Sequence, residues 1–435
     1  MHNIISNKIE IDRYLLNDEI HARPFFILKS PFRCCHFVYL NDEYSIDADL
    51  VHIKKLCTHF NVEVANHKTR QIDIDLGEIT FRWERHSEFS TYTFITKSEN
   101  SIDFSRSASQ YLEAEWMKNI PGELLHAMHI QTVKAPTIKA FPDISDKYLN
   151  GNPVIGGLVA DGQGTLLTDL RYCEDGFIRY ILIDHGHSPD RMGRTLQYVL
   201  ELETYRMMAM ISHPIAIETS SALGKLKEEL NDISNKMADI NKTQKQEVDS
   251  DRLLMARLMS LSAEVEQISM NVSYRFSATK AYYNIVKRRI AILREERLPK
   301  TQRITSFFAR RLGPAMHTCD TVSERLKALS ARVTRNASML RTRVDLVIEE
   351  QNQALLKSMD KRADIQLRLQ ETVEGLSVVA ISYYSIGILH FLLKATAKLY
   401  PIVEPTLFTG LASPFLVFLV IMMVRRVKKK LKKMH

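Results

Sequence analysis

Short apolar runs separated by turn residues fill the first 190 residues of the chain. Runs of β-branched and aromatic residues, bounded by Asn, Asp, Gly or Pro, predict strands. They lie at residues 34–40, 79–83, 89–96, 153–160 and 177–183. Between them, residues 46–60 and 107–119 carry apolar side chains at helical spacing. This mixture predicts an α+β domain over residues 1–190, with a largely antiparallel or mixed sheet.

Beyond Pro189 the apolar pattern becomes helical, and no further strand is expected. Residues 194–211 are amphipathic, and His213-Pro214 is expected to kink or end that helix. Two runs then repeat apolar residues at alternating spacings of three and four, which predicts a coiled-coil seam. The runs are Leu223, Leu226, Leu230, Ile233, Met237 and Ile240, and then Leu254, Leu258, Leu261, Val265, Ile268 and Val272.

A polar gap at residues 241–251 separates the two runs. It is either the tip of a helical hairpin or a weakened stretch of one helix. The hairpin is preferred, because Gln244, Glu247 and Asp251 remove apolar burial from consecutive seam positions.

A very long helix is expected after Pro299 and the Gly313-Pro314 pair, which break the helical pattern. Residues 315–393 contain no proline, and as one helix they would be about 118 Å long. Its seam runs through Leu326, Leu329, Val333 and Leu340, and then slips to Val344 and Val347. Such a helix must pack on the hairpin or on copies of itself, so residues 191–374 are interpreted as a coiled-coil stalk.

Two uncharged segments, residues 375–393 and 407–424, are each near the minimum length of a transmembrane helix. The alternative is a pair of buried core helices. A strongly basic tail at residues 425–435 follows the second segment directly, which favours membrane insertion. Basic residues also precede the first segment, whereas the loop between the segments has only Lys394 and Lys398, with Glu404. The positive-inside rule therefore predicts that both termini are cytoplasmic and that the loop faces the other side.

Polar residues within the first segment have two interpretations. Ser377, Tyr384 and His390 could line a pore, or they could serve helix packing, which Gly375 and Gly387 would also permit. Packing is preferred.

The net positive charge does not indicate a nucleic-acid-binding protein. The formal charge is +8, but the basic tail supplies seven of these charges, so the rest of the chain is close to neutral. With no nucleic-acid-binding motif, a nucleic-acid partner is not expected; the expected partners are membrane lipid and further copies of the chain. Five scattered cysteines without CxxC pairs indicate reduced thiols. The polar first residues predict no signal peptide.

Two polar clusters are candidate ligand-binding sites. Asn17, Glu19, His21 and Arg23 stand close together before Pro24, and Arg23 could bind an anion through two hydrogen bonds. The alternative is a hydrogen-bonded structural loop. The second cluster is Arg82, Glu84 and His86, which share one face of a predicted strand. A buried ion-pair network is the preferred interpretation there.

The sequence gives little indication of a metal site or a catalytic site. Asp184, His185, His187 and Asp190 lie in one turn, and His126 and His129 are close in sequence, but neither set predicts a metal site. No GxSxG, P-loop, GxGxxG or HExxH motif occurs. No metal or cofactor is expected, and a protein other than an enzyme is favoured.

Five stretches together resemble one bacterial family of uncharacterised membrane-anchored proteins, catalogued as a domain of unknown function, number thirty-four twenty-two in that series. They are residues 16–24 (LNDEIHARP), 82–94 (RWERHSEFSTYTF), 201–209 (ELETYRMMA), 341–345 (RTRVD) and 370–377 (QETVEGLS). The resemblance covers nearly the whole chain and implies no activity. With the two apolar segments it implies the bacterial inner membrane.

The layout is also similar to that of CorA-type magnesium channels, in which a long stalk helix continues into the first of two spans. Those channels carry Gly-Met-Asn at the end of that span. Here the region reads Gly387-Ile388-Leu389-His390, and the motif is absent, so only the architecture is similar.

Three functions are compatible with the sequence. The preferred one is a homo-oligomeric membrane protein that couples a cytoplasmic sensing or binding domain to the membrane, with a CorA-like channel or transporter as one form. A membrane-tethered scaffold or regulator without a pore is the alternative. An enzyme would require the Asn17–Arg23 loop and the Trp83 cluster to line one pocket.

Overall fold

The computed structural model describes residues 24–41, 45–63, 70–135, 144–243, 248–397 and 404–431. Asn17, Glu19, His21 and Arg23 lie outside these residues. The chain divides into two compact units. The first comprises residues up to Asp239 together with Ala256–Asn336, and the second comprises Ile240–Met255 together with Ala337–His435.

A mixed sheet of nine strands forms the centre of the first unit, in the order β2-β3-β4-β1-β5-β8-β7-β6-β9. Neighbouring strands are antiparallel except β5 and β8, which are parallel. The strands are β1 (Phe32–Leu40), β2 (Gln71–Asp75), β3 (Ile79–Arg85), β4 (Phe89–Lys97), β5 (Glu123–Lys134), β6 (Ile155–Val159), β7 (Gly164–Tyr172), β8 (Ile178–Asp184) and β9 (Glu296–Arg297). The predicted α+β class with a mixed sheet is confirmed.

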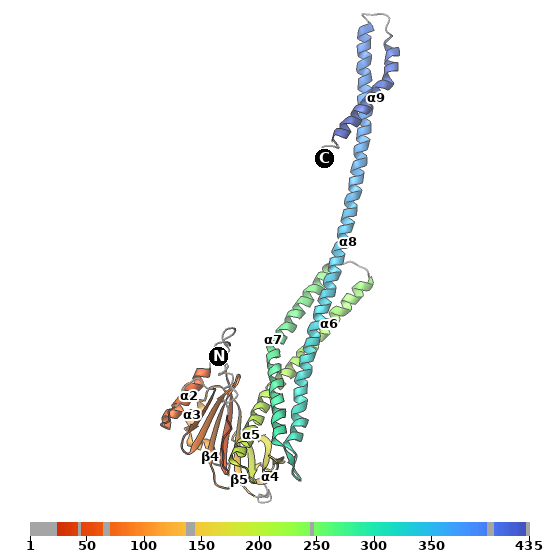
Figure 1. The fold of residues 1–435 in the computed structure, drawn as a ribbon. Coiled ribbons are helices and arrows are strands. Elements are labelled where there is room, and N and C mark those ends of the chain that lie inside the picture. Colours follow the sequence, from red (N-terminus) through yellow and green to blue (C-terminus); the bar gives the residue numbers. More distant parts are fainter. Residues whose placement is uncertain are drawn as a thin grey trace, which may run out of the picture. The chain divides into compact units, whose positions relative to one another are not determined.

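Helices cover both faces of this sheet (Figure 1). One face packs against α2 (Ser45–His59), η1 (Ala108–Tyr111), α3 (Ala114–Lys118) and α4 (Ile144–Tyr148). The other face packs against α5 (Pro189–Met210) and against apolar residues of α7 and α8. Alternate residues of a strand serve the two cores, as Tyr180 and Leu182 of β8 face α5 whereas Ile181 and Ile183 face α4.

Three long helices follow: α6 (Ser212–Thr243), α7 (Val248–Leu293) and α8 (Ile304–Ala397). Within the first unit α6 and α7 are antiparallel, because Arg257 of α7 pairs with Asp232 (3.1 Å) while Thr279 bonds to Ser212. α8 runs alongside α6, where Asn336 donates to Ser234 (2.7 Å). Seam residues of all three helices are buried: Leu223, Leu226, Leu230, Ile233, Leu258, Leu261, Val265, Leu326, Leu329 and Val333.

Two expectations about this region are wrong. β9 is a strand after Pro189, and it pairs with β6 through Gly157↔Arg297 and Leu158↔Glu296. The Gly313-Pro314 pair does not interrupt α8, which continues through Pro314. A proline removes one backbone hydrogen bond from a helix, and the long flanking helix with its buried residues Leu312 and Met316 outweighs that loss.

In the second unit, α8 and α9 (Pro405–Leu431) are long and apolar enough to cross a membrane. In each, only 6% of the most apolar window is buried within the chain, which argues against a pair of buried core helices. Nδ1 of His390 lies 3.1 Å from the Thr409 hydroxyl, so the two apolar segments contact each other. Every residue from Ile348 to Val373 of α8 is exposed.

Candidate functional site

A buried ion pair on α5 faces the sheet. Glu203 is fully buried, and both of its carboxylate oxygens accept hydrogen bonds from Arg206 (3.1, 3.1 and 2.6 Å). Burial raises the pKa of Glu203, but the neighbouring Arg206 guanidinium outweighs this, so the pKa lies below its usual value. Nε2 of His126 in β5 lies 3.8 Å from the same carboxylate, which is too far for a hydrogen bond. Nδ1 of His126 is 2.8 Å from the Tyr172 hydroxyl.

A second buried histidine joins β1 to β4 and α5. Nδ1 of His36 lies 2.8 Å from the Thr93 hydroxyl, and Nε2 lies 3.0 Å from that of Thr204. Burial lowers the pKa of His36 to about 3 and that of His126 to about 4. Both imidazoles are therefore neutral at pH 7, and they act as hydrogen-bonding links rather than as charged groups.

A small polar cavity of about 30 Å³ lies between α5 and the sheet. Its lining includes Glu84 and His86 from the second predicted cluster, and Gln197, Glu201 and Thr204 from α5. A cavity of this size has room for about one water molecule and none for a substrate. The polar groups at this interface tie the sheet to α5, as the contact of His36 with Thr204 shows.

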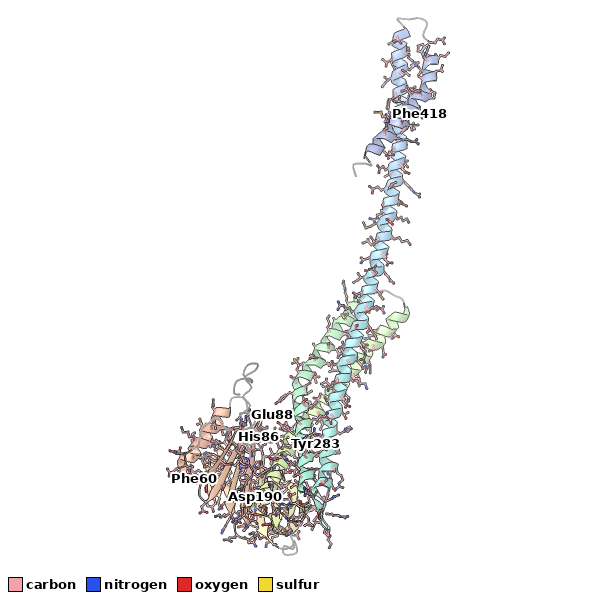
Figure 2. The ribbon with its side chains drawn as sticks, in the orientation of Figure 1. Phe60, His86, Glu88, Asp190, Tyr283 and Phe418 are labelled. Carbon is pink, nitrogen blue, oxygen red and sulfur yellow. The ribbon has the colours of Figure 1, made fainter. Side chains whose placement is uncertain are left out.

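Further ion pairs connect this interface to α7. Glu88 accepts hydrogen bonds from Arg275 (2.6 Å) and from the Tyr282 hydroxyl. Glu201 of α5 pairs with Arg289. Figure 2 shows His86 and Glu88 on the side of the sheet next to α7, where Tyr283 lies. The sheet, α5 and α7 are thus held together by buried and half-buried charges.

Arg82, the remaining member of the second predicted cluster, makes different contacts. It donates to Asp73 on the neighbouring strand β2 (2.9 Å), and its guanidinium lies over the Phe26 ring at 3.6 Å. The structure therefore places Glu84 and His86 at the cavity and Arg82 beside it in an ion pair. The first predicted cluster, Asn17–Arg23, lies outside the described residues.

Sequence reasoning missed a buried carboxylate on the opposite face of the sheet. Asp49 of α2 is fully buried and accepts hydrogen bonds from Arg85 (2.7 Å), Ser90 (2.6 Å) and Tyr92 (2.9 Å). The sequence feature that could have indicated this burial is the spacing of four residues between Asp49 and the core residue Ile53, which places both on one face of the helix.

The histidines of the β8–α5 turn are engaged in structural hydrogen bonds. His185 contacts Thr165 (2.8 Å) and the Ala135 carbonyl (2.6 Å). Asp184 accepts hydrogen bonds from the backbone N–H groups of Gly186 and His187. Burial alone would raise the pKa of Asp184, but these and the other bonds to His187 lower it to about 2. Among the described residues, no group of three or more His, Cys, Asp or Glu side chains could hold a metal ion.

A family model described as "Protein of unknown function (DUF3422)" matches residues 10–431. The chain belongs to this family. No curated protein matches it, and no solved structure matches it either. The architectural similarity to CorA-type channels therefore has no support from these comparisons.

The structure brings together two of the stretches that carry the resemblance to the DUF3422 family. Residues 82–94 supply Glu84 and His86 to the small cavity, and residues 201–209 supply Glu201, Thr204 and Tyr205. The rings of Phe89 and Tyr205 are in edge contact at 6.0 Å, and Tyr205 stacks on Tyr282 of α7. A third stretch, residues 341–345, supplies Arg343, which pairs with the buried Asp251 at 3.2 Å within the second unit.

The three predicted pore-lining residues lie on the apolar part of α8. Tyr384 and His390 line an open groove of about 770 Å³ between α8 and α9, together with Gly387 and Thr409. Ser377 is exposed, and its hydroxyl donates to the Val373 carbonyl of its own helix. A pore-lining role for these residues stays a prediction.

Acid should destabilise this protein through its buried histidines. Burial lowers the pKa of His129, like that of His126, to about 4, and that of His36 to about 3. The unfolded chain takes up protons near pH 6.5 and the folded chain only near pH 4, so the free energy of unfolding falls as the pH drops through this window. At about pH 5.5 each histidine should lower the free energy of unfolding by roughly 1.4 kcal/mol.

Chemical denaturation of the detergent-solubilised chain at several pH values measures this effect. A His129→Gln variant should lose up to about a third of the pH-dependent change, because His36, His126 and also His52, whose pKa burial lowers too, keep the rest. A free energy of unfolding that is equal at about pH 7.5 and pH 5.5 would show that these histidines are protonated in the folded state.

Proposed function

We propose that this protein is a homo-oligomeric, membrane-tethered regulator of the bacterial inner membrane. Its α+β domain lies in the cytoplasm, and α8 connects that domain to the membrane. The charge distribution supports the orientation: Lys357, Lys361, Arg362 and Arg368 precede the apolar part of α8, and residues 425–435 contain seven Lys or Arg.

The observation that carries the coupling is the attachment of α8 to the sheet. Residues just before α8 pair with β6, where Gly156 donates to the Gln302 carbonyl (2.8 Å) and Thr301 to the Gly156 carbonyl (3.2 Å). Glu295 accepts hydrogen bonds from the first backbone N–H groups of α8, those of Ile304 (2.6 Å) and Thr305 (2.9 Å). α8 then continues unbroken to Ala397. A change at the sheet can therefore be passed along one helix to its apolar end.

Self-association is supported by the exposed part of α8. From Ile348 to Val373 every side chain of this helix is exposed, so no other described residue covers it. An isolated helix has only marginal stability in water. On a heptad spacing from residue 348 to residue 376, six of nine seam positions are apolar and 49–73% exposed: Ile348, Leu355, Met359, Leu369, Val373 and Leu376. Asn352, Arg362 and Gln366 hold the other three positions. Burying such side chains contributes about 1.5–3 kcal/mol each, so a parallel coiled coil with a second copy stabilises the segment.

Disulfide crosslinking tests this association. We expect Leu355→Cys, at the seam, to form a covalent dimer in membranes under mild oxidation, because copies anchored in one membrane align in parallel. Lys357→Cys, two residues away and outside the seam, is the matched control and should crosslink poorly. Of the native cysteines, Cys34, Cys35, Cys57 and Cys319 are buried, whereas Cys173 is half-buried, so both variants carry Cys173→Ser to keep the background low. Equal yields at both positions would contradict a specific seam.

The contact between His390 and Thr409 favours a membrane tether rather than a pore. His390 uses Nδ1 in the contact between α8 and α9, which is a packing role. Tyr384 and His390 are also six residues apart, and at about 100° per residue they point roughly 120° away from each other. Ser377 and Tyr384, seven residues apart, share one face, so it is His390 that does not continue a single polar stripe along this helix.

A further inference from the structure

A second cavity in the first unit is rich in arginine. It has a volume of about 440 Å³ and lies where the start of α5, the end of α7 and the β6–β7 turn meet. We call it the arginine pocket, and its polar lining is Asp161, Arg191, Arg194, Thr195, Tyr198 and Arg294. The size is within the usual range for small-molecule sites, about 300–1,000 Å³.

Backbone contacts fix two walls of the arginine pocket. The Ala160 N–H donates to the Leu293 carbonyl (3.0 Å), which joins the β6–β7 turn to the end of α7. Arg294 ends α7 with a φ of 48°, and its Nη1 donates to both carboxylate oxygens of Asp161 (2.9 and 2.8 Å). This exposed ion pair orients the Arg294 guanidinium toward Asp161 at the rim of the pocket.

The charge of the pocket is unbalanced. Three arginines face one carboxylate, which leaves a net charge of +2. Arg294 is paired with Asp161, and Arg191 also attracts this carboxylate electrostatically. Neither Arg191 nor Arg194 forms an ion pair or hydrogen bond with the described residues through its side chain. The nearby Glu201 is engaged by Arg289 and Gln197, so it does not neutralise them.

One wall is aromatic. The Tyr198 ring is in edge contact with Phe25 at 5.9 Å, and the guanidinium of Arg289 lies over it at 5.4 Å. These contacts hold the ring at the pocket while part of it stays accessible. A ligand with a planar or apolar body can pack there, with its charged group toward the arginines.

We propose that the arginine pocket binds a phosphate monoester with a planar or apolar body. A phosphate monoester carries a charge of about −2 near pH 7, which matches the net charge of the pocket. Guanidinium groups present paired N–H donors that fit two phosphate oxygens at once. This inference deepens the proposed regulator by naming the ligand class of its cytoplasmic domain. It does not depend on self-association through α8.

Calorimetry on the full chain in detergent tests the pocket, with phenyl phosphate as the probe and phenol as the uncharged comparison. We expect binding of phenyl phosphate and none of phenol. The double variant Arg191→Gln/Arg194→Gln should bind roughly a hundredfold more weakly, about tenfold for each lost guanidinium. Both side chains are exposed, so the variant should keep the melting temperature of the parent. Arg310→Gln, at an exposed arginine of α8 outside the pocket, is the matched control.

A short-chain phosphatidic acid, tested in the same way, separates a soluble ligand from a lipid headgroup. Binding of phenyl phosphate assigns a soluble ligand, and binding of the phosphatidic acid alone assigns a headgroup; either supports the pocket if the double variant loses it. Binding of neither probe, or equal loss in Arg310→Gln, would overturn the proposal. Crosslinking through Leu355→Cys can still succeed in that case, so the two proposals fail separately.

Discussion

Glu203→Ala is expected to lower the free energy of unfolding by about 3–5 kcal/mol. The substitution leaves Arg206 without its carboxylate at a site where Glu203 is fully buried and the Arg206 side chain is 16% exposed. Breaking a buried ion pair from one side costs this much because the remaining charge stays desolvated. Total stability of a domain is only about 5–15 kcal/mol, so the melting temperature should fall sharply.

Two further variants separate this effect from helix propensity. Glu218→Ala, at an exposed position of α6, should change stability by less than about 0.5 kcal/mol. Glu203→Ala/Arg206→Ala removes both charges and should be more stable than Glu203→Ala alone, because no buried charge remains unpaired. Circular dichroism melts of the purified chains provide the comparison. A Glu203→Ala chain as stable as Glu218→Ala would mean that the pair contributes nothing to the fold.

Leu230→Asp is expected to open the pairing of α6 with its neighbouring helices. Leu230 is fully buried in the seam of α6. The change removes about 1.5–3 kcal/mol of apolar burial and places an unpaired charge there, which costs several kcal/mol more. We expect lost helicity and rapid proteolysis between residues 222 and 272. Residues before Pro189 should resist cleavage, because the two cores on the face of the sheet covered by α2, α3 and α4 consist, apart from Leu298, of residues before Pro189.

Lys227→Asp is the matched control for this variant, since Lys227 is exposed on the same helix and receives the same side chain. It should keep the parental protease resistance. Limited proteolysis followed by mass spectrometry of the fragments measures both chains. Equal resistance of Leu230→Asp and the parent chain would contradict the burial of the seam in the folded protein.

The strands that the sequence predicted are those with apolar runs bounded by turn residues. β1, β3, β4, β6 and β8 were expected within a few residues of their observed bounds. β5 was missed because its sequence, ELLHAMHIQTVK, contains leucine, alanine and methionine, which favour helices. It is a strand because it pairs with both β1 and β8 in the middle of the sheet. Such long-range pairing overrides local propensity.

The helical hairpin was predicted for a sound physical reason. Polar residues at successive seam positions end the apolar burial, and α6 and α7 indeed lie on either side of residues 244–247. β9 could not be predicted, since two residues carry no periodicity and their pairing with β6 depends on tertiary structure. Pro314 was given too much weight as a helix breaker.

The candidate site was predictable only in part. The alternation in β3 placed Arg82, Glu84 and His86 on one face, and the structure finds two of them at the small cavity. The burial of Glu203 gave no sequence signal, because its neighbours His126 and Tyr180 come from β5 and β8. The arginine pocket likewise combines residues about 30 and 100 positions apart in sequence, which no local pattern brings together.

Topology mapping tests the central claim most directly, that a cytoplasmic body is anchored by the apolar parts of α8 and α9. Reporters that are active on only one side of the membrane are fused before Met1, within the 394–406 loop and after His435. We expect both terminal reporters to show the cytoplasmic side and the loop reporter to show the opposite side. Terminal reporters on opposite sides, or a loop reporter in the cytoplasm, would contradict the two-span anchor.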